Sequence, residues 1–396
     1  MEKKLMALAV AGALAVPAGA FAAASSLQIS GRLTYEYGYS SQGDNRPGAD
    51  IADNPGGSNI RFKGEEKLGG GLSAWFQCET STDVRALDTS LHFCSRNSAI
   101  GLKGAFGNIH FGKWDTPMKR ALNAGTVGAE ATGMLGMSFI AFGGSGGAQA
   151  TNIPGAGLDQ GANRQRWKRR ESSLNYYESP KFSNFQVLAA FSTGNAATSA
   201  TNNQANTKPR VISFAGVYNN GPLEFGIGYE KHDEFGAHQT GATIDLDDDA
   251  WGVGVAYTFG QVQVGAFYLD ATYETGPGAE STKKTYGIGV DWRLPGPHKL
   301  SAQYVKADDT GGNGGSIGGN GGVTGCGAVP NCADTGGDAY TLGYTYHFSK
   351  RTSVLLGYTR YDNDSRTRVY RVGNIGSLGV NGESSSAYGM LWKHNY

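Results

Sequence analysis

Large apolar residues alternate with small or polar residues along much of the chain, and this two-residue period constrains the fold more than any other feature. Residues 223–230, LEFGIGYE, put leucine, phenylalanine, isoleucine and tyrosine on one face and glycine and glutamate on the other. Residues 339–348, AYTLGYTYHF, repeat the pattern. Because successive side chains of a β-strand point to opposite faces, the alternation predicts strands with one apolar face each.

The alternation continues to the last residue of the sequence. In residues 386–396, SAYGMLWKHNY, the aromatic residues Tyr388, Trp392 and Tyr396 share one face. The last residues of soluble domains usually fray, because few contacts repay the entropy of ordering them. We therefore predict that the last strand pairs with the first, LQISGRLTYEY, and leaves no free edge.

The connections between the predicted strands are alternately short and long. Seven tight turns, such as LGGG and LPGPH, alternate with eight long segments, among them 272–283. This rhythm predicts an up-and-down antiparallel sheet with every long loop at one end. The sixteen predicted strands are 27–40, 58–66, 72–81, 96–103, 108–114, 169–181, 185–192, 210–219, 222–231, 250–259, 261–271, 284–294, 298–307, 339–348, 352–362 and 385–396.

Two architectures can hold such a sheet, a soluble sandwich or a transmembrane barrel. In a sandwich the apolar faces meet in a core, whereas in a barrel they meet lipid and the other face lines a wet lumen. The second face here is rich in glycine, serine, threonine and charge, and aromatic residues recur near the strand ends, where an interfacial girdle lies in membrane barrels. Only a closed barrel satisfies every backbone group in lipid. We predict an all-β fold, a sixteen-stranded antiparallel transmembrane barrel.

The amino terminus predicts export. Residues 1–22 have two lysines, an apolar run and the small residues Ala20 and Ala22, as in a secretory signal peptide. We expect cleavage after Ala22, with Ala24 as the alternative. We expect residues 23–396 to form a single barrel domain. Removal of the peptide leaves 32 basic and 33 acidic residues, so the global charge argues against nucleic-acid binding.

Four cysteines are consistent with an oxidising compartment. Their positions favour local pairing, Cys78 with Cys94 and Cys326 with Cys332, among the three possible connectivities. A zinc site is the rival interpretation, but the chain lacks the usual Cys-x-x-Cys spacing. We expect no metal and no cofactor.

Two stretches resemble a known family. The segment NIRFKGEEKLGGGLSAWFQCE (59–79) followed by SRNSAIGLKGAFGNIHFGKWDTP (95–117) is similar to the general porins of Gram-negative bacteria, in particular those of β-proteobacteria. The resemblance implies a homotrimer in outer-membrane lipid, with each barrel a water-filled channel for small hydrophilic solutes. It also implies that the third long loop, 115–168, folds inward, and that the barrel-assembly machinery reads the aromatic residues of the last strand.

The resemblance and the strand parity together indicate pore-lining residues. Arg96 and Arg169 match wall arginines of the family, and the parity from Arg169 puts Leu174 and Tyr176 on the outer face. Parity alone puts Arg32, Arg61 and Lys63 on the inner face. Glu130 and Asp159 are the expected acidic residues of the third loop. The predicted constriction therefore consists of Arg32, Arg61, Lys63, Arg96, Arg169, Glu130 and Asp159.

Because the basic residues outnumber the acidic ones in this set, we expect a diffusion channel that prefers anions. The alternative is a substrate-selective channel with a site for one anion or sugar, which would need an aromatic track along the lumen. Phe267 and Leu269 are the inward candidates for such a track. A barrel enzyme is a third possibility, but no Ser, His and Asp set lies at a strand end.

Overall fold

The structure is a computed structural model that describes residues 26–43, 48–53, 57–84, 93–128, 133–143, 166–192, 209–235, 246–317, 332–372 and 380–396. The predicted signal peptide, residues 1–22, lies outside these ranges.

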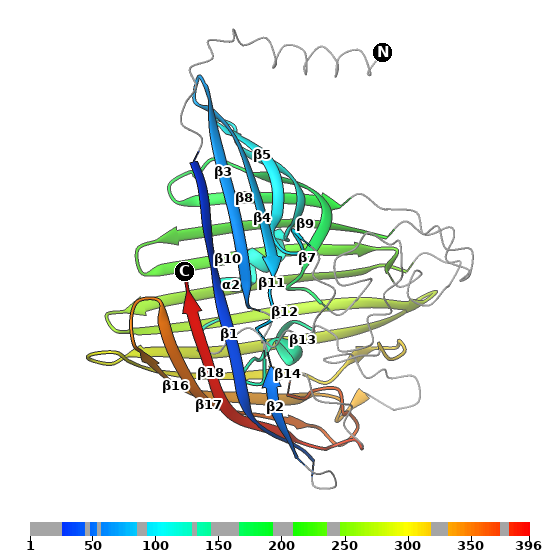
Figure 1. Cartoon of the computed structure of the whole chain (residues 1–396). Helices are drawn as coiled ribbons and strands as arrows, with labels where there is room; N and C mark the ends of the chain where they lie inside the picture. Colours follow the sequence, from blue (N-terminus) through cyan, green and yellow to red (C-terminus); the bar gives the residue numbers. More distant parts are fainter. Residues whose placement is uncertain are drawn as a thin grey trace.

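Sixteen long strands and two short ones form one antiparallel sheet within the described residues, and each predicted strand is present (Figure 1). The short strands are β2 (Ala49–Asp53) and β15 (Gly311–Gly312). The long strands are β1 (Ser26–Gln42), β3 (Asn59–Gly69), β4 (Leu72–Ser81), β5 (Ser98–Gly104), β6 (Gly107–Asp115), β7 (Arg170–Glu178), β8 (Phe185–Ser192), β9 (Arg210–Asn220), β10 (Leu223–Asp233), β11 (Asp248–Phe259), β12 (Val262–Gly276), β13 (Ala279–Arg293), β14 (His298–Ala307), β16 (Gly337–His347), β17 (Thr352–Asn363) and β18 (Ser385–Asn395).

The sheet closes on itself. β1 pairs with β3 on one side and with β18 on the other, so the first and last long strands lie side by side (Figure 1). Tyr396 extends the ladder, because its backbone N–H donates to the carbonyl of Gly31 at 3.0 Å and its carbonyl accepts from the Gly31 N–H at 3.1 Å. The predicted pairing of the two chain ends is confirmed, and the fold is a closed sixteen-stranded barrel.

The two faces of the sheet differ in composition. We call the face with exposed aromatic and aliphatic residues, such as Ile227 and Tyr229, the aromatic face. The opposite face, with buried glycines such as Gly226 and Gly228 and with buried polar residues, is the glycine-rich face. The alternation in the sequence therefore separates the faces as expected.

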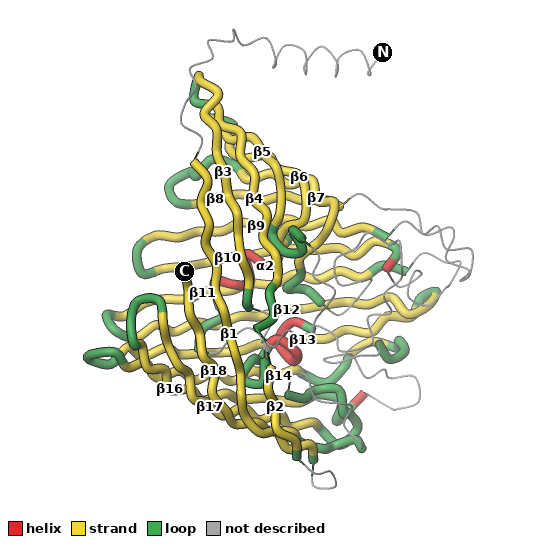
Figure 2. Tube along the Cα trace, in the orientation of Figure 1, coloured by secondary structure: helices red, strands yellow, loops and turns green. Residues whose placement is uncertain are grey.

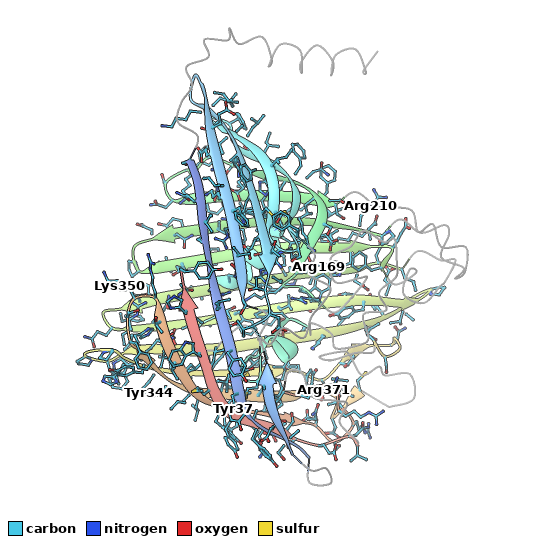
Figure 3. The ribbon with its side chains drawn as sticks, viewed as in Figure 1. Tyr37, Arg169, Arg210, Tyr344, Lys350 and Arg371 are labelled. Atoms are coloured by element: carbon cyan, nitrogen blue, oxygen red, sulfur yellow. A yellow bond between two sulfur atoms is a disulfide. The ribbon has the colours of Figure 1, made fainter. Side chains whose placement is uncertain are left out.

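The two ends of the barrel differ in the length of their connections (Figure 2). Lys350 lies in a tight turn at one end, and Arg210 begins β9 at the other end (Figure 3). The prediction of a long loop at residues 272–283 is wrong. Residues 272–283 continue the ladder, with Thr272 paired to Thr282, and the hairpin turns at Gly278, whose φ of 67° suits glycine.

The largest apolar core lies on the glycine-rich face rather than between two sheets. Two short helices, α2 (Pro117–Asn123) and α3 (Ser138–Phe142), contribute to it from the segment between β6 and β7. Among the described residues, no helix has the length and apolar character needed to cross a membrane.

Candidate functional site

The segment that follows β6 packs on the glycine-rich face. Thr116 caps α2, its hydroxyl accepting from the backbone N–H of Lys119, and Pro117 occupies the first turn, where its missing N–H costs nothing. Met118 and Ala121 are fully buried, and a Cβ added at Gly226 of β10 would overlap the backbone of Ala121. Glycine at this position therefore allows the helix to approach the sheet closely.

Further along, four hydrogen bonds attach the same segment to strands around the barrel. Side chains of β14, β13 and β17 donate to its carbonyls at 2.6–3.0 Å, and a carboxylate of β1 accepts from its backbone at 2.9 Å. These strands lie on both sides of the seam between β18 and β1, so the segment contacts much of the glycine-rich face. The pairs are Gln303 with Val127, Thr285 with Ala141, Tyr361 with Gly136, and Glu36 with Met134.

Buried aromatic and charged residues hold the segment in place where it rejoins the sheet, just before β7. The ring of Trp167 stacks on His232 with 4.1 Å between centroids. Arg169 pairs with Glu171 at 2.6 Å, both side chains being 0% exposed, and its guanidinium lies 5.0 Å from the ring centroid of Phe235. Arg169 was predicted at the pore wall, but its charge is shielded from solvent and fixes the base of the segment.

The parity predicted from Arg169 is wrong. Leu174 and Tyr176 are each 1% exposed and cluster with Ala121, so they lie on the glycine-rich face, not the outer one. The cause is an irregularity at the start of β7. Ser173 has a φ of 54°, and the register with β6 shifts between Gly112 and Trp114. An inserted residue moves every later side chain to the other face.

Two of the predicted arginines share one carboxylate. Oε2 of Glu79 lies 2.7 Å from Nη2 of Arg61 on the neighbouring strand, and Oε1 lies 2.5 Å from Nε of Arg96. The Glu79 side chain is 3% exposed, whereas that of Arg61 is 42% exposed. Sequence reasoning identified both arginines and missed the glutamate that positions them.

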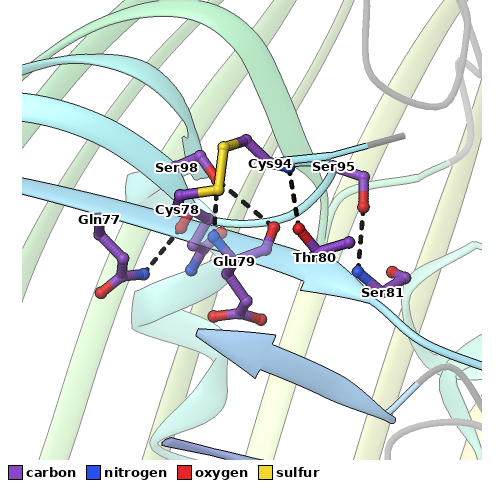
Figure 4. The surroundings of a disulfide bond; sticks show 9 residues. Gln77, Cys78, Glu79, Thr80, Ser81, Cys94, Ser95 and Ser98 are labelled. Carbon is purple, nitrogen blue, oxygen red and sulfur yellow. Dashed lines mark hydrogen bonds between the residues drawn. A yellow bond between two sulfur atoms is a disulfide. The ribbon is translucent and has the colours of Figure 1, made fainter. Parts of the chain in front are cut away.

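A disulfide holds Arg96 beside β4 (Figure 4). Cys78 is bonded to Cys94, as predicted, and the N–H of Cys94 donates to Thr80 at 2.9 Å. The N–H of Glu79 donates to Ser98 at 2.9 Å. Cys332 is also disulfide-bonded, and its predicted partner, Cys326, lies outside the described residues.

Asp115, at the end of β6, gathers a second group of cations. It lies 2.6 Å from Lys119 and 3.4 Å from Arg170, and it accepts from Asn97 at 3.1 Å. Asn97 in turn accepts from Arg170 at 2.5 Å. Because Asn97 follows Arg96 in the chain, the two groups are adjacent.

Lys168 adds a titratable charge to this group. Its ammonium donates to Thr126 at 3.0 Å and lies 4.5 Å from the ring centroid of Phe142. Desolvation, together with the nearby charge of Lys119, lowers the pKa of Lys168 to about 7. Desolvation also lowers the pKa of Lys119, although Asp115 opposes this.

These residues form what we call the basic cluster. Among the described residues it contains six basic residues and two carboxylates, so basic residues are in excess. Its members are Arg61, Arg96, Lys119, Lys168, Arg170 and Arg166, whose Nε donates to the carbonyl of Lys168 at 3.3 Å, together with Glu79 and Asp115.

The remaining predicted residues lie near the cluster or outside the described ranges. Arg32 follows the parity of the buried Thr34 and donates to the carbonyl of Gly57 at 2.8 Å. Lys63 lies on β3 two residues beyond Arg61. Glu130 and Asp159 are outside the described residues.

A closed antiparallel barrel with aromatic and aliphatic residues exposed on one face and polar residues buried on the other is typical of outer-membrane β-barrel proteins. Residues 7–366 match the family described as Gram-negative porin, and the chain belongs to this family. It is therefore a porin of the bacterial outer membrane, a passive channel and not an enzyme.

Individual relatives agree with this assignment. Outer membrane porin protein 32 of Delftia acidovorans is 25% identical over 403 residues, covering 100% of each chain. The anion-selective porin from Comamonas acidovorans has the same fold, with a TM-score of 0.71 and 19% identity over 94% of this chain and 100% of that one. OmpT of Vibrio cholerae, in a trimer form, gives a TM-score of 0.59 with 17% identity over 94% and 100%.

Proposed function

We propose that this porin prefers anions and that the basic cluster lies at its narrowest part. The observation that carries the proposal is the excess of basic residues over carboxylates, six against two among the described residues, on the glycine-rich face and on the segment that packs on it. The chain as a whole has no net charge, so selectivity has to come from the position of charges.

The glycine-rich face lines the lumen in this proposal, and the third long loop folds inward over it. The contacts of α2 with Gly226 and the hydrogen bond from Gln303 to Val127 support this placement. A barrel of sixteen strands is wide enough for an aqueous channel, so an internal segment narrows the lumen without closing it. Arg32 and Lys63 extend the positive wall, and Glu130 and Asp159 remain predicted acidic residues of this loop.

Coulomb's law gives the size of the interaction between charges in the cluster. Two unit charges 4 Å apart interact by roughly 4 kcal/mol at an effective dielectric constant near 20. An excess of basic residues at the wall therefore produces a positive potential that attracts chloride and repels potassium. Salt screens charges beyond about 10 Å at 0.1 M, so the effect persists where the ion passes close to the wall.

A reversal-potential measurement tests the proposal. The purified protein in a planar bilayer, under a tenfold gradient of KCl, is expected to give a reversal potential of the sign set by chloride permeation. A channel that prefers potassium under the same gradient contradicts the proposal.

The alternative of a substrate-selective channel has less support. Phe267 and Leu269 are 4% and 3% exposed, and Phe267 packs against Phe142 with 4.6 Å between centroids. These side chains are covered by the segment after β6 and offer no aromatic track to a solute.

We also propose that residues 1–22 are removed, that residues 23–396 form the mature barrel, and that the mature protein is a homotrimer. Similarity to a solved porin in trimer form supports the assembly, as do exposed apolar residues on β1, such as Leu27 and Ile29. The barrel-assembly machinery is the proposed reader of the last strand, where Tyr388 and Trp392 are exposed on the aromatic face and the backbone of Tyr396 pairs with β1.

A further inference from the structure

Two basic residues face each other across the hairpin that joins β13 and β14, at the end of the barrel with the tight turns. The register pairs Arg293 with Lys299, and both follow the parity of Gly289 and Gln303 on the glycine-rich face. Side chains directly opposite each other on neighbouring strands lie about 4.5–5.5 Å apart at Cβ, and like charges in this position are destabilising. A pair that breaks this rule indicates a function for the two charges.

Hydrogen bonds to the strands on both sides fix the backbone of this hairpin. The N–H of Arg293 donates to the carbonyl of Gln261, next to β12, at 2.9 Å. On the other side β14, which carries Lys299, pairs with β16, and the N–H of His347 donates to the carbonyl of Pro297 at 2.8 Å. The fold therefore holds the two basic residues opposite each other.

The carboxylate of Asp291 lies beside the pair and contacts one of its members. Both oxygens of Asp291 are 3.2 Å from the ammonium of Lys299, and one accepts from the hydroxyl of Ser301 at 2.5 Å. The ammonium has three N–H groups and the Lys299 side chain is 27% exposed, so it can contact Asp291 and a second anion together. Arg293 is exposed, and no described carboxylate forms an ion pair with it.

Basic residues outnumber carboxylates along this part of the tight-turn end, which Lys350 marks in Figure 3. His347 of β16 lies near Arg293, Lys299 and Lys393, so basic residues of β13, β14 and β18 surround one position. On β9 to β12, by contrast, Glu224 is the charged residue at this end. From β13 to β18, the charged groups within three residues of a tight turn or of the chain end are Arg293, Lys299, Lys350, Arg351 and Lys393, with Asp291 and the terminal carboxylate of Tyr396.

We propose that Arg293 and Lys299 bind a divalent oxyanion at the mouth of the channel that carries the tight turns. The proposal rests on the glycine-rich face lining the lumen, as in the proposed function, but it concerns a site outside the basic cluster. The guanidinium of Arg293 presents its N–H groups in a fork that matches two oxygens of one oxyanion, and Lys299 supplies a second charge from the opposite strand. Because the two charges lie close together, the site binds a dianion more strongly than chloride.

Sulfate inhibition of single channels in a planar bilayer tests the proposal. Potassium sulfate is added to one side and then to the other, in dilute KCl, where screening is weak. We expect sulfate to lower the chloride current of the wild type at a lower concentration from one side than from the other, and more strongly than the monovalent methanesulfonate does at equal ionic strength. Arg293→Gln/Lys299→Gln should need about fivefold more sulfate for the same reduction, since exposed ion pairs are individually weak.

Two further variants are matched controls. Lys284→Gln/Lys306→Gln removes two lysines from the aromatic face and should be inhibited as the wild type is. Arg293→Lys/Lys299→Arg keeps both charges and should retain most of the inhibition. Heat-sensitive electrophoretic mobility confirms that the variants are folded.

Equal inhibition of the wild type and of Arg293→Gln/Lys299→Gln overturns the proposal, as does inhibition by methanesulfonate that is as strong as that by sulfate. Reversal potentials in a KCl gradient are measured in parallel. A wild-type channel that prefers potassium contradicts the proposed function, whereas the difference in sulfate inhibition between the variants tests the oxyanion site by itself.

Discussion

Basic residues gather in the basic cluster and also in a cavity lined by Lys284 and Lys306 of β13 and β14, and the surroundings of these two regions differ. In the basic cluster, Glu79 and Asp115 each hold two cations within 3.4 Å, yet cations still outnumber carboxylates by four. In the cavity, which we call the lysine pocket, the two lysines lie beside Asp308, Asp309 and Asp364, and the ion pair from Lys284 to Asp270 is 3.8 Å long. The side chains of the cluster are partly buried and held by ion pairs, whereas Lys284 and Lys306 are exposed.

The difference follows from the elements that supply the side chains. A disulfide, a capped helix and the buried base of the third loop fix the cluster, so its cations cannot move away from one another to relieve their repulsion. The pocket lies on an exposed sheet face, where solvent screens each charge. The same residue types are therefore held close together in one region and screened by solvent in the other.

Neutralising the arginines of the cluster is expected to have the largest effect. Arg61→Gln/Arg96→Gln removes two of the four excess charges and leaves Glu79 unpaired, so the preference for chloride should fall strongly or vanish. Glu79→Gln should have the opposite effect. Reversal potentials in a KCl gradient give both results. The variant Lys284→Gln/Lys306→Gln removes the same number of charges from the aromatic face, and a shift of equal size there contradicts the distinction between the two regions.

Arg169 is expected to affect stability rather than selectivity, because its guanidinium is fully buried against Glu171. Removing one partner of a buried ion pair costs about 3–5 kcal/mol. Arg169→Gln should therefore lower the temperature or the urea concentration at which the folded barrel is lost, while the reversal potential of the folded fraction stays within error of the wild type. A large change of selectivity with unchanged stability would show that Arg169 faces the pore.

The barrel could be predicted from the sequence because its signals, the two-residue period and the spacing of turns, involve residues that are close together in the chain. The two-residue period and the alternation of turns gave the strands to within a few residues, and the terminal pattern predicted the pairing of β1 with β18. Residues 272–283 were missed as strand because threonine and glutamate replaced the large apolar residues there, although the alternation around Tyr273 continued.

The candidate site was only partly predictable, since it depends on contacts between distant segments. Strand parity identified Arg61 as an inner residue. The irregularity at Ser173 exchanged the faces of Leu174 and Tyr176, and the local sequence pattern does not signal this irregularity. Asp115 and Lys119 were detectable in principle, because an acidic and a basic residue four apart at a helix start often pair. The position of Lys168 beside them requires the folded loop.

The smallest expected effect is a dependence of selectivity on pH, and it tests whether the cluster holds one titratable cation. Because the pKa of Lys168 is lowered to about 7, its amine is charged below that pH and neutral above it. The chloride preference should therefore increase as the pH falls from 8 to 6. Lys168→Met should keep the lower preference at both values, and Lys168→Arg the higher, since arginine stays charged throughout this range. Every other titratable group is unchanged in both variants. If Lys168→Met retains the full pH dependence of the wild type, another group is responsible and the desolvated lysine does not contribute to the field.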